Sequence, residues 1–105
     1  MILNNYETIY ILKPQTNEET NIKLVNQCKN IIQSYGGKNI FVQHKSRRHL
    51  SFNIKKNYDG IYIQINYEGN GNIVKAIEKA MRLNDDIIRY LTIKHKKNYI
   101  EEMHI

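Results

Sequence analysis

Four histidines are the first residues to consider for chemistry, because an imidazole can act as a general base or bind a metal ion. They are His44, His49, His95 and His104, and none is accompanied by a nucleophile together with carboxylates placed to orient it. His44 and His49 are five residues apart, a spacing that puts them on opposite faces of a regular strand. The histidines therefore indicate neither a catalytic site nor a metal site.

Three other short patterns could support chemistry, but each has a simpler structural explanation. Asp85-Asp86 resembles a carboxylate pair, yet its setting favours the end of a helix and a turn. Gly69 and Gly71 follow a strand that pairs antiparallel to its neighbour, which makes a phosphate-binding loop a weak interpretation. Cys28 is the only cysteine and lies on an apolar helical stripe, where a buried small side chain is expected. We therefore predict no enzyme, no metal and no cofactor.

The stretch HKSRRHLSFNIKK, residues 44–56, has a more specific character. No Asp or Glu occurs between Glu19 and Asp59, and the whole chain carries a net charge of +6. An ordinary solvated surface mixes charge signs, whereas a cluster of cations releases counterions when it meets a phosphate backbone. The strand GIYIQINY lacks the basic-glycine-aromatic motif of single-stranded RNA readers, so recognition of shape and phosphate is the better hypothesis. The cations of this basic segment are Lys45, Arg47, Arg48, Lys55 and Lys56.

The length and composition limit the class of protein. A chain of 105 residues predicts one domain, and no apolar run approaches the roughly 20 residues needed to cross a bilayer. Strand-like alternation begins within a few residues of Met1, so we expect no signal or transit peptide. Lysine outnumbers arginine by twelve to four, and Ile and Asn are also frequent. This bias is typical of AT-rich coding and favours an organelle genome or an AT-rich bacterium.

The first half of the chain predicts a strand, a helix and a second strand. Residues 6–13 form the first strand, which Pro14 closes. Residues 16–19 offer a capping box, with Thr16 as the expected N-cap of a helix over residues 17–35. Gly36-Gly37 should end that helix. An extended stretch over residues 38–55 follows, and its polar middle, residues 43–49, suggests a bulge or an exposed overhang.

The second half predicts the same order of strand, helix and strand. A turn at residues 57–60 leads to a strand over residues 61–67, a loop over residues 68–72, and a helix from Ile73 to about Leu83. A break at residues 84–86 precedes a last strand, residues 87–94. Two split βαβ units of this kind predict an α+β fold, the ferredoxin-like βαββαβ sandwich, with a four-stranded antiparallel sheet and two helices on one face. The first and third strands should be central, and we expect the domain over residues 1–96 and a C-terminal tail over residues 97–105.

Both faces of the predicted sheet look hydrophobic, although helices can cover only one of them. In the first strand Tyr6, Tyr10 and Leu12 oppose Ile9 and Ile11. The last strand is similar, because Ile88 and Tyr90 oppose Ile87, Leu91 and Ile93. Scattered surface hydrophobes are one explanation, and a partner protein on the helix-free face is the other. The second explanation predicts a partner-protein face of Ile9, Ile11, Tyr62, Leu91 and Ile93, or of the opposite side chains if the assignment of faces is reversed.

Four segments in combination resemble one family. They are YETIYILKP, YGGK, SRRHLSFNIKK and NDDIIRYLTIK, and they span residues 6 to about 96. Together they are similar to the bacterial-type small-ribosomal-subunit protein S-six. The resemblance implies a ferredoxin-like fold without enzymatic activity that binds the central domain of small-subunit rRNA, paired with ribosomal protein S-eighteen. It also implies a ribosome of a plastid or a bacterium, and the coding bias favours the plastid.

The resemblance can be carried over only where the residues match. Arg47 and Arg48 match the family's double arginine, and Arg89 and Lys94 match cations of its last strand. The sequence departs from the family at Ser46, where glycine is usual, and at Asn53, where proline is usual. The rRNA-binding residues predicted from the basic segment and the resemblance together are Lys45, Arg47, Arg48, Lys55, Lys56, Arg89 and Lys94.

Two other functions remain open at the level of the sequence. A stand-alone ferredoxin-like regulatory module that binds a small anion is the main alternative. An enzyme of the acylphosphatase type is the third, but it needs an arginine in a glycine-rich loop after the first strand, and residues 13–15, Lys-Pro-Gln, offer neither. Co-sedimentation with ribosomal small subunits would separate a ribosomal protein from both alternatives.

Overall fold

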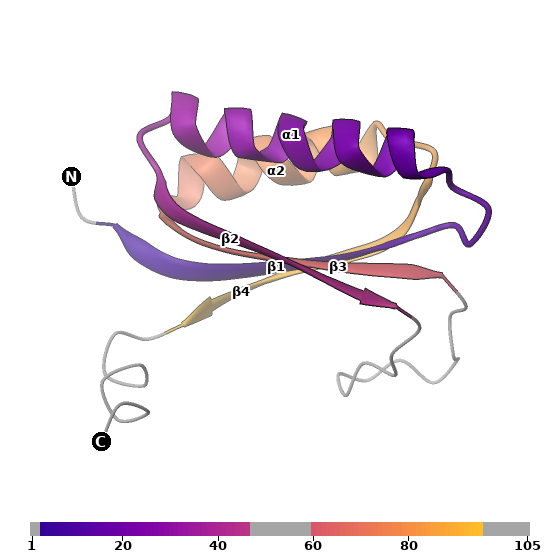
Figure 1. The fold of residues 1–105 in the computed structure, drawn as a ribbon. Helices are drawn as coiled ribbons and strands as arrows, with labels where there is room; N and C mark the ends of the chain where they lie inside the picture. The colour runs from indigo at the N-terminus through magenta and orange to yellow at the C-terminus, as the bar shows by residue number, and fades with distance from the viewer. Residues whose placement is uncertain (1–2, 47–59, 96–105) are drawn as a thin grey trace, which may run out of the picture.

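The sheet and the two helices form two layers, and both helices cover the same face of the sheet (Figure 1). The structure is a computed structural model that describes residues 3–46 and 60–95. The antiparallel sheet has four strands in the order β2-β3-β1-β4, so the predicted ferredoxin-like fold and its central strands are confirmed. No helix in the described ranges is long and apolar enough to span a membrane. The elements are β1 (Asn4–Leu12), α1 (Glu18–Ser34), β2 (Lys38–Ser46), β3 (Ile61–Gly69), α2 (Gly71–Arg82) and β4 (Ile87–His95).

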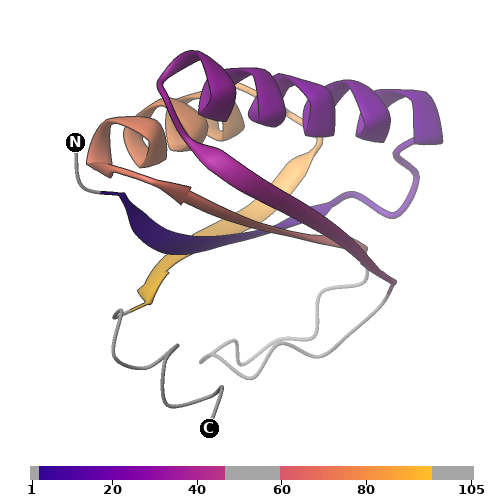
Figure 2. The same ribbon diagram turned by 60° about the vertical axis from the view of Figure 1, so that its left-hand side comes forward.

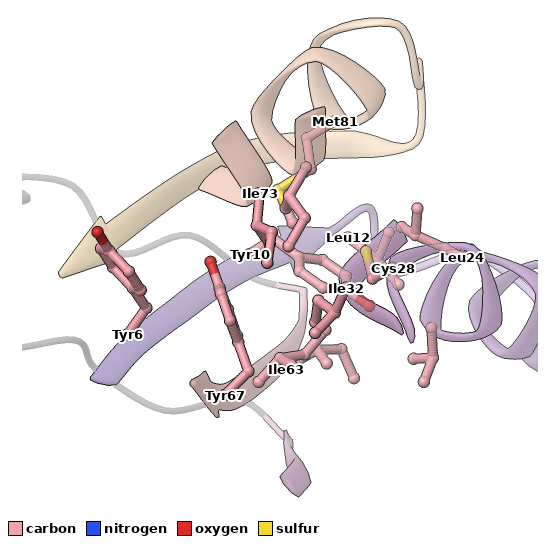
Figure 3. Close-up of a cluster of buried hydrophobic side chains, with 13 residues drawn as sticks. Tyr6, Tyr10, Leu12, Leu24, Cys28, Ile32, Ile63, Tyr67, Ile73 and Met81 are labelled. Atoms are coloured by element: carbon pink, nitrogen blue, oxygen red, sulfur yellow. The ribbon is translucent and has the colours of Figure 1, made fainter. Parts of the chain in front are cut away.

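The main core lies between the sheet and the helices. Tyr10 of β1 pairs with Ile63 of β3 on one side and with Tyr90 of β4 on the other. Paired residues point to the same face of a sheet, so these side chains all meet the helices. Tyr6 and Tyr67 stack with ring centroids 5.8 Å apart (Figure 3). The buried members of this helix-side core are Tyr6, Tyr10, Leu12, Leu24, Val25, Cys28, Ile32, Ile63, Ile65, Tyr67, Ile73, Ile77 and Met81.

Helix α1 begins one residue later than the capping box predicted. Asn17 is the N-cap, and its side chain accepts a hydrogen bond from the backbone N–H of Thr20 at 2.8 Å. Thr16 instead belongs to the preceding turn, where its N–H donates to the carbonyl of Lys13 at 3.0 Å. The Thr16 hydroxyl is buried and has no hydrogen-bond partner. The prediction of Thr16 as N-cap is therefore wrong, because the turn holds Thr16 away from the first free N–H groups of the helix.

The predicted end of α1 is confirmed. Gly36 has a φ of 87°, a left-handed conformation that glycine adopts without a steric penalty. The N–H of Gly37 then donates to the carbonyl of Ile32 at 2.8 Å. A Cβ on Gly37 would lie 2.5 Å from a side-chain atom of Ile32. Both glycines are thus needed for the chain to reverse tightly into β2.

The predicted loop over residues 68–72 is almost absent. β3 continues to Gly69 and α2 starts at Gly71, so only Asn70 separates them. Asn70 caps α2 by accepting a hydrogen bond from the N–H of Ile73 at 3.1 Å. Gly69 fits the close approach of strand and helix, because a Cβ there would lie 2.9 Å from Ile73 Cδ1. Gly69 and Gly71 suggested a longer loop in the sequence. A single residue, Asn70, is sufficient for the turn because it also caps α2.

The turn predicted after α2 is confirmed. The side chain of Asn84 accepts a hydrogen bond from the N–H of Asp86 at 2.9 Å, which is typical of an Asx turn. The carbonyl of Asp86 in turn accepts from the N–H of Lys13 at 2.9 Å. Asp85-Asp86 therefore has a structural role in directing the chain from α2 into β4.

The polar middle of the second strand does not form the expected bulge or overhang within the described residues. From Gln43, which pairs with Gln64, to Ser46, which pairs with Ile61, β2 follows β3 in regular register. The register shift lies earlier, between Lys38 and Phe41, next to Asn39 with its φ of 56°. Main-chain pairing needs no apolar side chain, so a polar sequence can still form an edge strand. The rest of the predicted strand, residues 47–55, lies outside the described residues.

One face assignment in the last strand is wrong. Ile87 was expected to share a face with Leu91 and Ile93, but it packs against the helix-side core. The cause is a register shift in β1 and β4, since Arg89 pairs with Ile11 while Ile87 pairs with Leu12. An irregularity of this kind breaks the two-residue alternation from which the faces were predicted.

The two candidate caps of α1 can be separated by mutation. Asn17→Ala should lower the free energy of unfolding by about 1 kcal/mol, because it removes the hydrogen bond to the N–H of Thr20. Thr16→Val keeps the shape of the side chain and removes a buried hydroxyl that has no partner, so stability should be unchanged or slightly higher. Urea unfolding followed by circular dichroism measures both. A larger loss in Thr16→Val than in Asn17→Ala would contradict this capping arrangement.

Candidate functional site

The five residues predicted to contact a partner protein lie on one face of the sheet. Tyr62 pairs with Ile11, and Leu91 pairs with Ile9. Ile93 pairs with Glu7, two residues from Ile9 on β1, and therefore points the same way. Helices α1 and α2 cover the other face (Figure 1). The structure thus places the five side chains together on the helix-free face, as the sequence predicted.

These residues form a second apolar group, separate from the helix-side core. Ile11, Tyr62 and Ile9 are 1%, 4% and 9% exposed, yet none of them belongs to the cluster beneath the helices. Leu91 is half-buried, and Ile93 is 37% exposed. We call this set, Ile9, Ile11, Tyr62, Leu91 and Ile93, the apolar group of the helix-free face. Its exposed margin at Ile93 offers apolar area that a partner could bury.

Phe41 belongs to the same face and was missed in the sequence. It pairs with Asn66, which also pairs with Glu7 of the helix-free face, and its side chain is 57% exposed. Ile40 and Val42, the residues on either side, both pack against the helix-side core. Strand alternation around Phe41 could therefore have indicated its direction. Phe41 extends the apolar surface to the edge strand β2.

Polar contacts divide the helix-free face. On β3, the side-chain amide of Gln64 donates to Asn66 Oδ1 at 2.9 Å. Across β1 and β4, His95 Nε2 lies 3.3 Å from Glu7 Oε1. On β1 and β4 the apolar side chains alternate with Glu7, Arg89 and His95, and on β3 the amides follow Tyr62. A partner bound here would meet apolar and polar side chains at fixed positions, which would fix its orientation.

The structure describes only three of the seven predicted rRNA-binding residues, Lys45, Arg89 and Lys94. Lys45 is in β2, with its backbone paired to Tyr62, whereas Arg47, Arg48, Lys55 and Lys56 lie outside the described residues. β2 ends and β3 begins side by side, with Ser46 paired to Ile61, at the end of the sheet away from the helix layer (Figure 2). The described chain therefore leaves β2 and enters β3 next to Tyr62, beside the apolar group.

Arg89 and Lys94 are exposed on β4 but point in opposite directions. Arg89 pairs with Ile11 and shares the helix-free face, while Lys94 pairs with Tyr6 and shares the helix side. The odd spacing of five residues explains this separation. The two cations are therefore not parts of one cluster on β4, and Arg89 is the one that adjoins the apolar group.

The buried ionisable groups are held in their neutral forms. Burial raises the pKa of the Cys28 thiol to about 12. Burial also raises the pKa of Tyr67 to about 12, although a hydrogen bond with the Thr8 hydroxyl at 3.0 Å acts in the opposite direction. The pKa of Tyr10 is raised by burial and by the nearby Cys28. A thiol with so high a pKa is a poor nucleophile at neutral pH, so Cys28 is a packing residue.

The fold and its surfaces define a class of protein before any comparison. Within residues 3–46 and 60–95, no three His, Cys, Asp or Glu side chains are grouped so that they could hold a metal ion. The prominent features are an apolar group on the helix-free face and, in the sequence between β2 and β3, a basic segment. These are the features of an α+β binding domain.

Comparison with known proteins identifies the family. The family model described as "Ribosomal protein S6" matches residues 5–94, which is most of the chain. This chain belongs to the ribosomal protein S6 family of the small ribosomal subunit, and its members are structural proteins rather than enzymes. The predicted family and the predicted lack of enzymatic activity are confirmed. The matched residues also fall inside the predicted domain, residues 1–96.

Plastid and cyanobacterial proteins are among the relatives. "Small ribosomal subunit protein bS6c" of the red alga Gracilaria tenuistipitata var. liui is 59% identical over 95 residues, covering 90% of this chain and 92% of the relative. "Small ribosomal subunit protein bS6" of Synechococcus sp. is 47% identical over 92 residues, covering 88% and 68% of the two chains. These likenesses indicate a plastid or bacterial ribosome.

A solved structure supports the same conclusion. The crystal structure of 30S ribosomal protein S6 from Thermotoga maritima superposes with a TM-score of 0.76 at 28% identity, covering 97% of this chain and 96% of that chain. A protein from Arabidopsis thaliana, At3g17210, reaches a TM-score of 0.57 at 12% identity, with 88% and 93% coverage. The latter likeness concerns the fold alone.

The buried thiol and phenol predict how stability depends on pH. Folded Cys28 keeps its proton up to a pKa of about 12, whereas the unfolded chain releases it near the ordinary value of 9.0. The unfolded state therefore binds fewer protons above pH 9, and stability should fall as pH rises from about 9. Tyr67, raised from 10.0 to about 12, should add to the fall above pH 10.

Urea unfolding between pH 7 and pH 10.5 measures this dependence. Cys28→Ala should be less stable at pH 7, because it leaves a small cavity, but its stability should fall less steeply between pH 9 and pH 10. Equal slopes in the two proteins would show that Cys28 ionises freely in the folded state.

Proposed function

We propose that the chain binds the central domain of small-subunit rRNA together with ribosomal protein S-eighteen. The observation that carries the proposal is the apolar group of the helix-free face, which lies beside the end of β2 and the start of β3, the two strands that flank most of the basic segment in the sequence. An apolar surface suits a protein partner, and a cationic segment suits phosphate. The arrangement lets one partner meet the sheet while RNA meets the adjoining segment.

The protein-docking role rests on the two-sided burial of the sheet. Ile9, Ile11 and Tyr62 are almost fully buried within the chain itself, so they form a rigid apolar base for this face rather than contact area of their own. Ile93 and Phe41 extend it with exposed apolar surface on either side. The amide pair of Gln64 and Asn66 supplies polar contacts at its margin. S-eighteen is the partner that the resemblance implies for this face.

The RNA-binding role rests on charge and position. In the proposal, Lys45, Arg47, Arg48, Lys55 and Lys56 contact phosphates, and each neutralised phosphate releases counterions. Arg89 shares the face of the apolar group, so it would contact RNA where RNA and S-eighteen meet. Lys94 is on the other side of β4 and would reach a separate phosphate.

We assign the chain to a plastid ribosome. Relatives named bS6c from three red algae are 59%, 53% and 49% identical to it and one from Guillardia theta is 44% identical, whereas four cyanobacterial relatives named bS6 are 41–47% identical. The frequent Lys, Ile and Asn, which are typical of AT-rich coding, are compatible with the same assignment. Co-sedimentation of the tagged chain with plastid small subunits, rather than with subunits of another compartment, tests it.

Neutralising the basic segment should weaken RNA binding and leave folding nearly intact. The variant Arg47→Gln, Arg48→Gln, Lys55→Gln, Lys56→Gln removes four potential phosphate contacts. The slope of log affinity against log salt for a central-domain rRNA transcript should become shallower by about 3, at roughly 0.7–0.9 per contact. Filter binding from 50 to 300 mM KCl, with S-eighteen present, measures the slope. Binding that matches the unmodified chain across the titration would refute the RNA-binding role.

Polar substitution at the margin of the apolar group should weaken the protein partnership. Ile93→Gln removes apolar contact area from the helix-free face and should reduce affinity for S-eighteen about fivefold, or about 1 kcal/mol. Ile22→Gln is the matched control, because Ile22 is 51% exposed on α1 in the helix layer. Isothermal titration with purified S-eighteen measures both. If the two variants lose affinity equally, docking on the helix-free face is wrong.

A further inference from the structure

The outward face of α2 carries a row of cations that neither the basic segment nor the family resemblance includes. Ile73, Ile77 and Met81 face the core, whereas Lys75, Lys79 and Arg82 are exposed on the opposite side. Their spacing of four and three residues aligns the three cations along one face of the helix. We call Lys75, Lys79 and Arg82 the α2 cation row.

The cation row is not neutralised by the rest of the described structure. Within residues 3–46 and 60–95, none of the three cations forms an ion pair. Glu78, the acid within α2, is half-buried and close enough to Tyr67 for its charge to help raise the pKa of that residue. It lies on the flank of α2, three residues after Lys75 and four before Arg82, and within the described residues it forms an ion pair with neither. The charge of the row is exposed to solvent.

The exposed surface of α1 lacks a similar row of unpaired cations, so the positive charge of the helix layer is concentrated on α2. On α1, Lys23 pairs with Glu19 at 3.7 Å. The rest of the exposed surface of α1 consists mainly of uncharged amides and hydroxyls, at Asn26, Gln27, Asn30, Gln33 and Ser34. A face that serves only solubility would mix signs, as α1 begins to do. The helix layer is thus positive over α2 and nearly neutral over α1.

We propose that the α2 cation row is a second RNA contact, which binds the phosphate backbone of a strand other than the one on the basic segment. The inference rests on the proposed rRNA-binding function. Along the helix axis Lys75 and Arg82 are about 10 Å apart, enough to contact more than one phosphate of a strand. Arg82 can bind a phosphate through two N–H groups, and the lysines contribute point charges.

The position of α2 makes this contact compatible with the rest of the assembly. Both helices lie on the opposite side of the sheet from the apolar group (Figure 1). RNA on α2 would therefore leave the proposed S-eighteen surface free. The domain would lie between RNA on its helix layer and a protein on its open face, with the basic segment beside the latter.

A salt titration with a matched control tests the inference. The variant Lys75→Gln, Lys79→Gln, Arg82→Gln is compared with Lys23→Gln, Lys29→Gln, Lys38→Gln, which removes the same charge from the side of α1. Both are assayed as full chains on the central-domain rRNA transcript with S-eighteen present. The α2 variant should make the salt slope shallower by about 2 and bind on the order of tenfold more weakly at 0.1 M KCl. The control should remain within about twofold of the unmodified chain, the margin expected from net charge alone.

Several outcomes would overturn the inference. If the α2 variant matches the control while the basic-segment variant still loses affinity, the second contact fails and the proposed function stands. If none of the variants loses affinity, the proposed rRNA binding itself fails. If the α2 variant loses affinity for S-eighteen in the absence of RNA, the row binds an acidic protein surface instead.

A directed cleavage experiment locates the strand. Lys79→Cys carries a tethered iron chelate that cleaves nearby RNA, and Lys23→Cys carries the same probe on α1. Cys28 is buried with a pKa raised to about 12, so the introduced thiol is the one that reacts. We expect cleavage of an rRNA segment from position 79 that is absent from position 23. Equal cleavage patterns, or none from position 79, would contradict the proposal.

Discussion

The structure depends on burying the central strand β1 on both of its faces. β1 pairs with β3 on one side and β4 on the other, so neither its backbone nor its side chains can be left to water. Tyr10 and Leu12 meet the helices, and Ile9 and Ile11 meet the opposite side. Ile9, Ile11 and Tyr62 are already buried within the chain, so the proposed partner protein would cover the exposed margin of that face at Ile93 and Phe41.

The same burial makes the interior chemically inert. Cys28, Tyr10 and Tyr67 are the ionisable groups most strongly affected, and burial keeps all three in their neutral forms. The hydroxyls of Thr8, Tyr67 and Thr92 bond to one another rather than to a substrate, at 3.0 and 2.9 Å. A structural protein of the ribosome needs a stable interior and surfaces that bind specific partners. The hydrogen bonds among these hydroxyls stabilise the interior.

Function is distributed over surfaces that differ in charge and polarity. The helix-free face carries the apolar group, the chain leaves β2 and enters β3 beside Tyr62, and α2 presents a row of cations on the outside of the helix layer. The apolar group and the cation row lie on opposite sides of one small sandwich. This geometry suits a protein that is held among several partners in a particle, because each contact can form without displacing another.

The sequence by itself determined the order of elements, the central strands and the two apolar sets of β1, because alternation and helical spacing are local properties. The sequence also determined the positive charge of the basic segment, because charge follows directly from residue types. Tertiary structure decided the N-cap at Asn17, the one-residue turn at Asn70 and the burial of Ile87 on the helix side. It also decided the direction of Phe41 and the separation of Arg89 from Lys94. These features depend on register shifts between strands and on which atoms a turn brings close together. Such contacts join residues far apart in the chain, so a single sequence predicts them poorly.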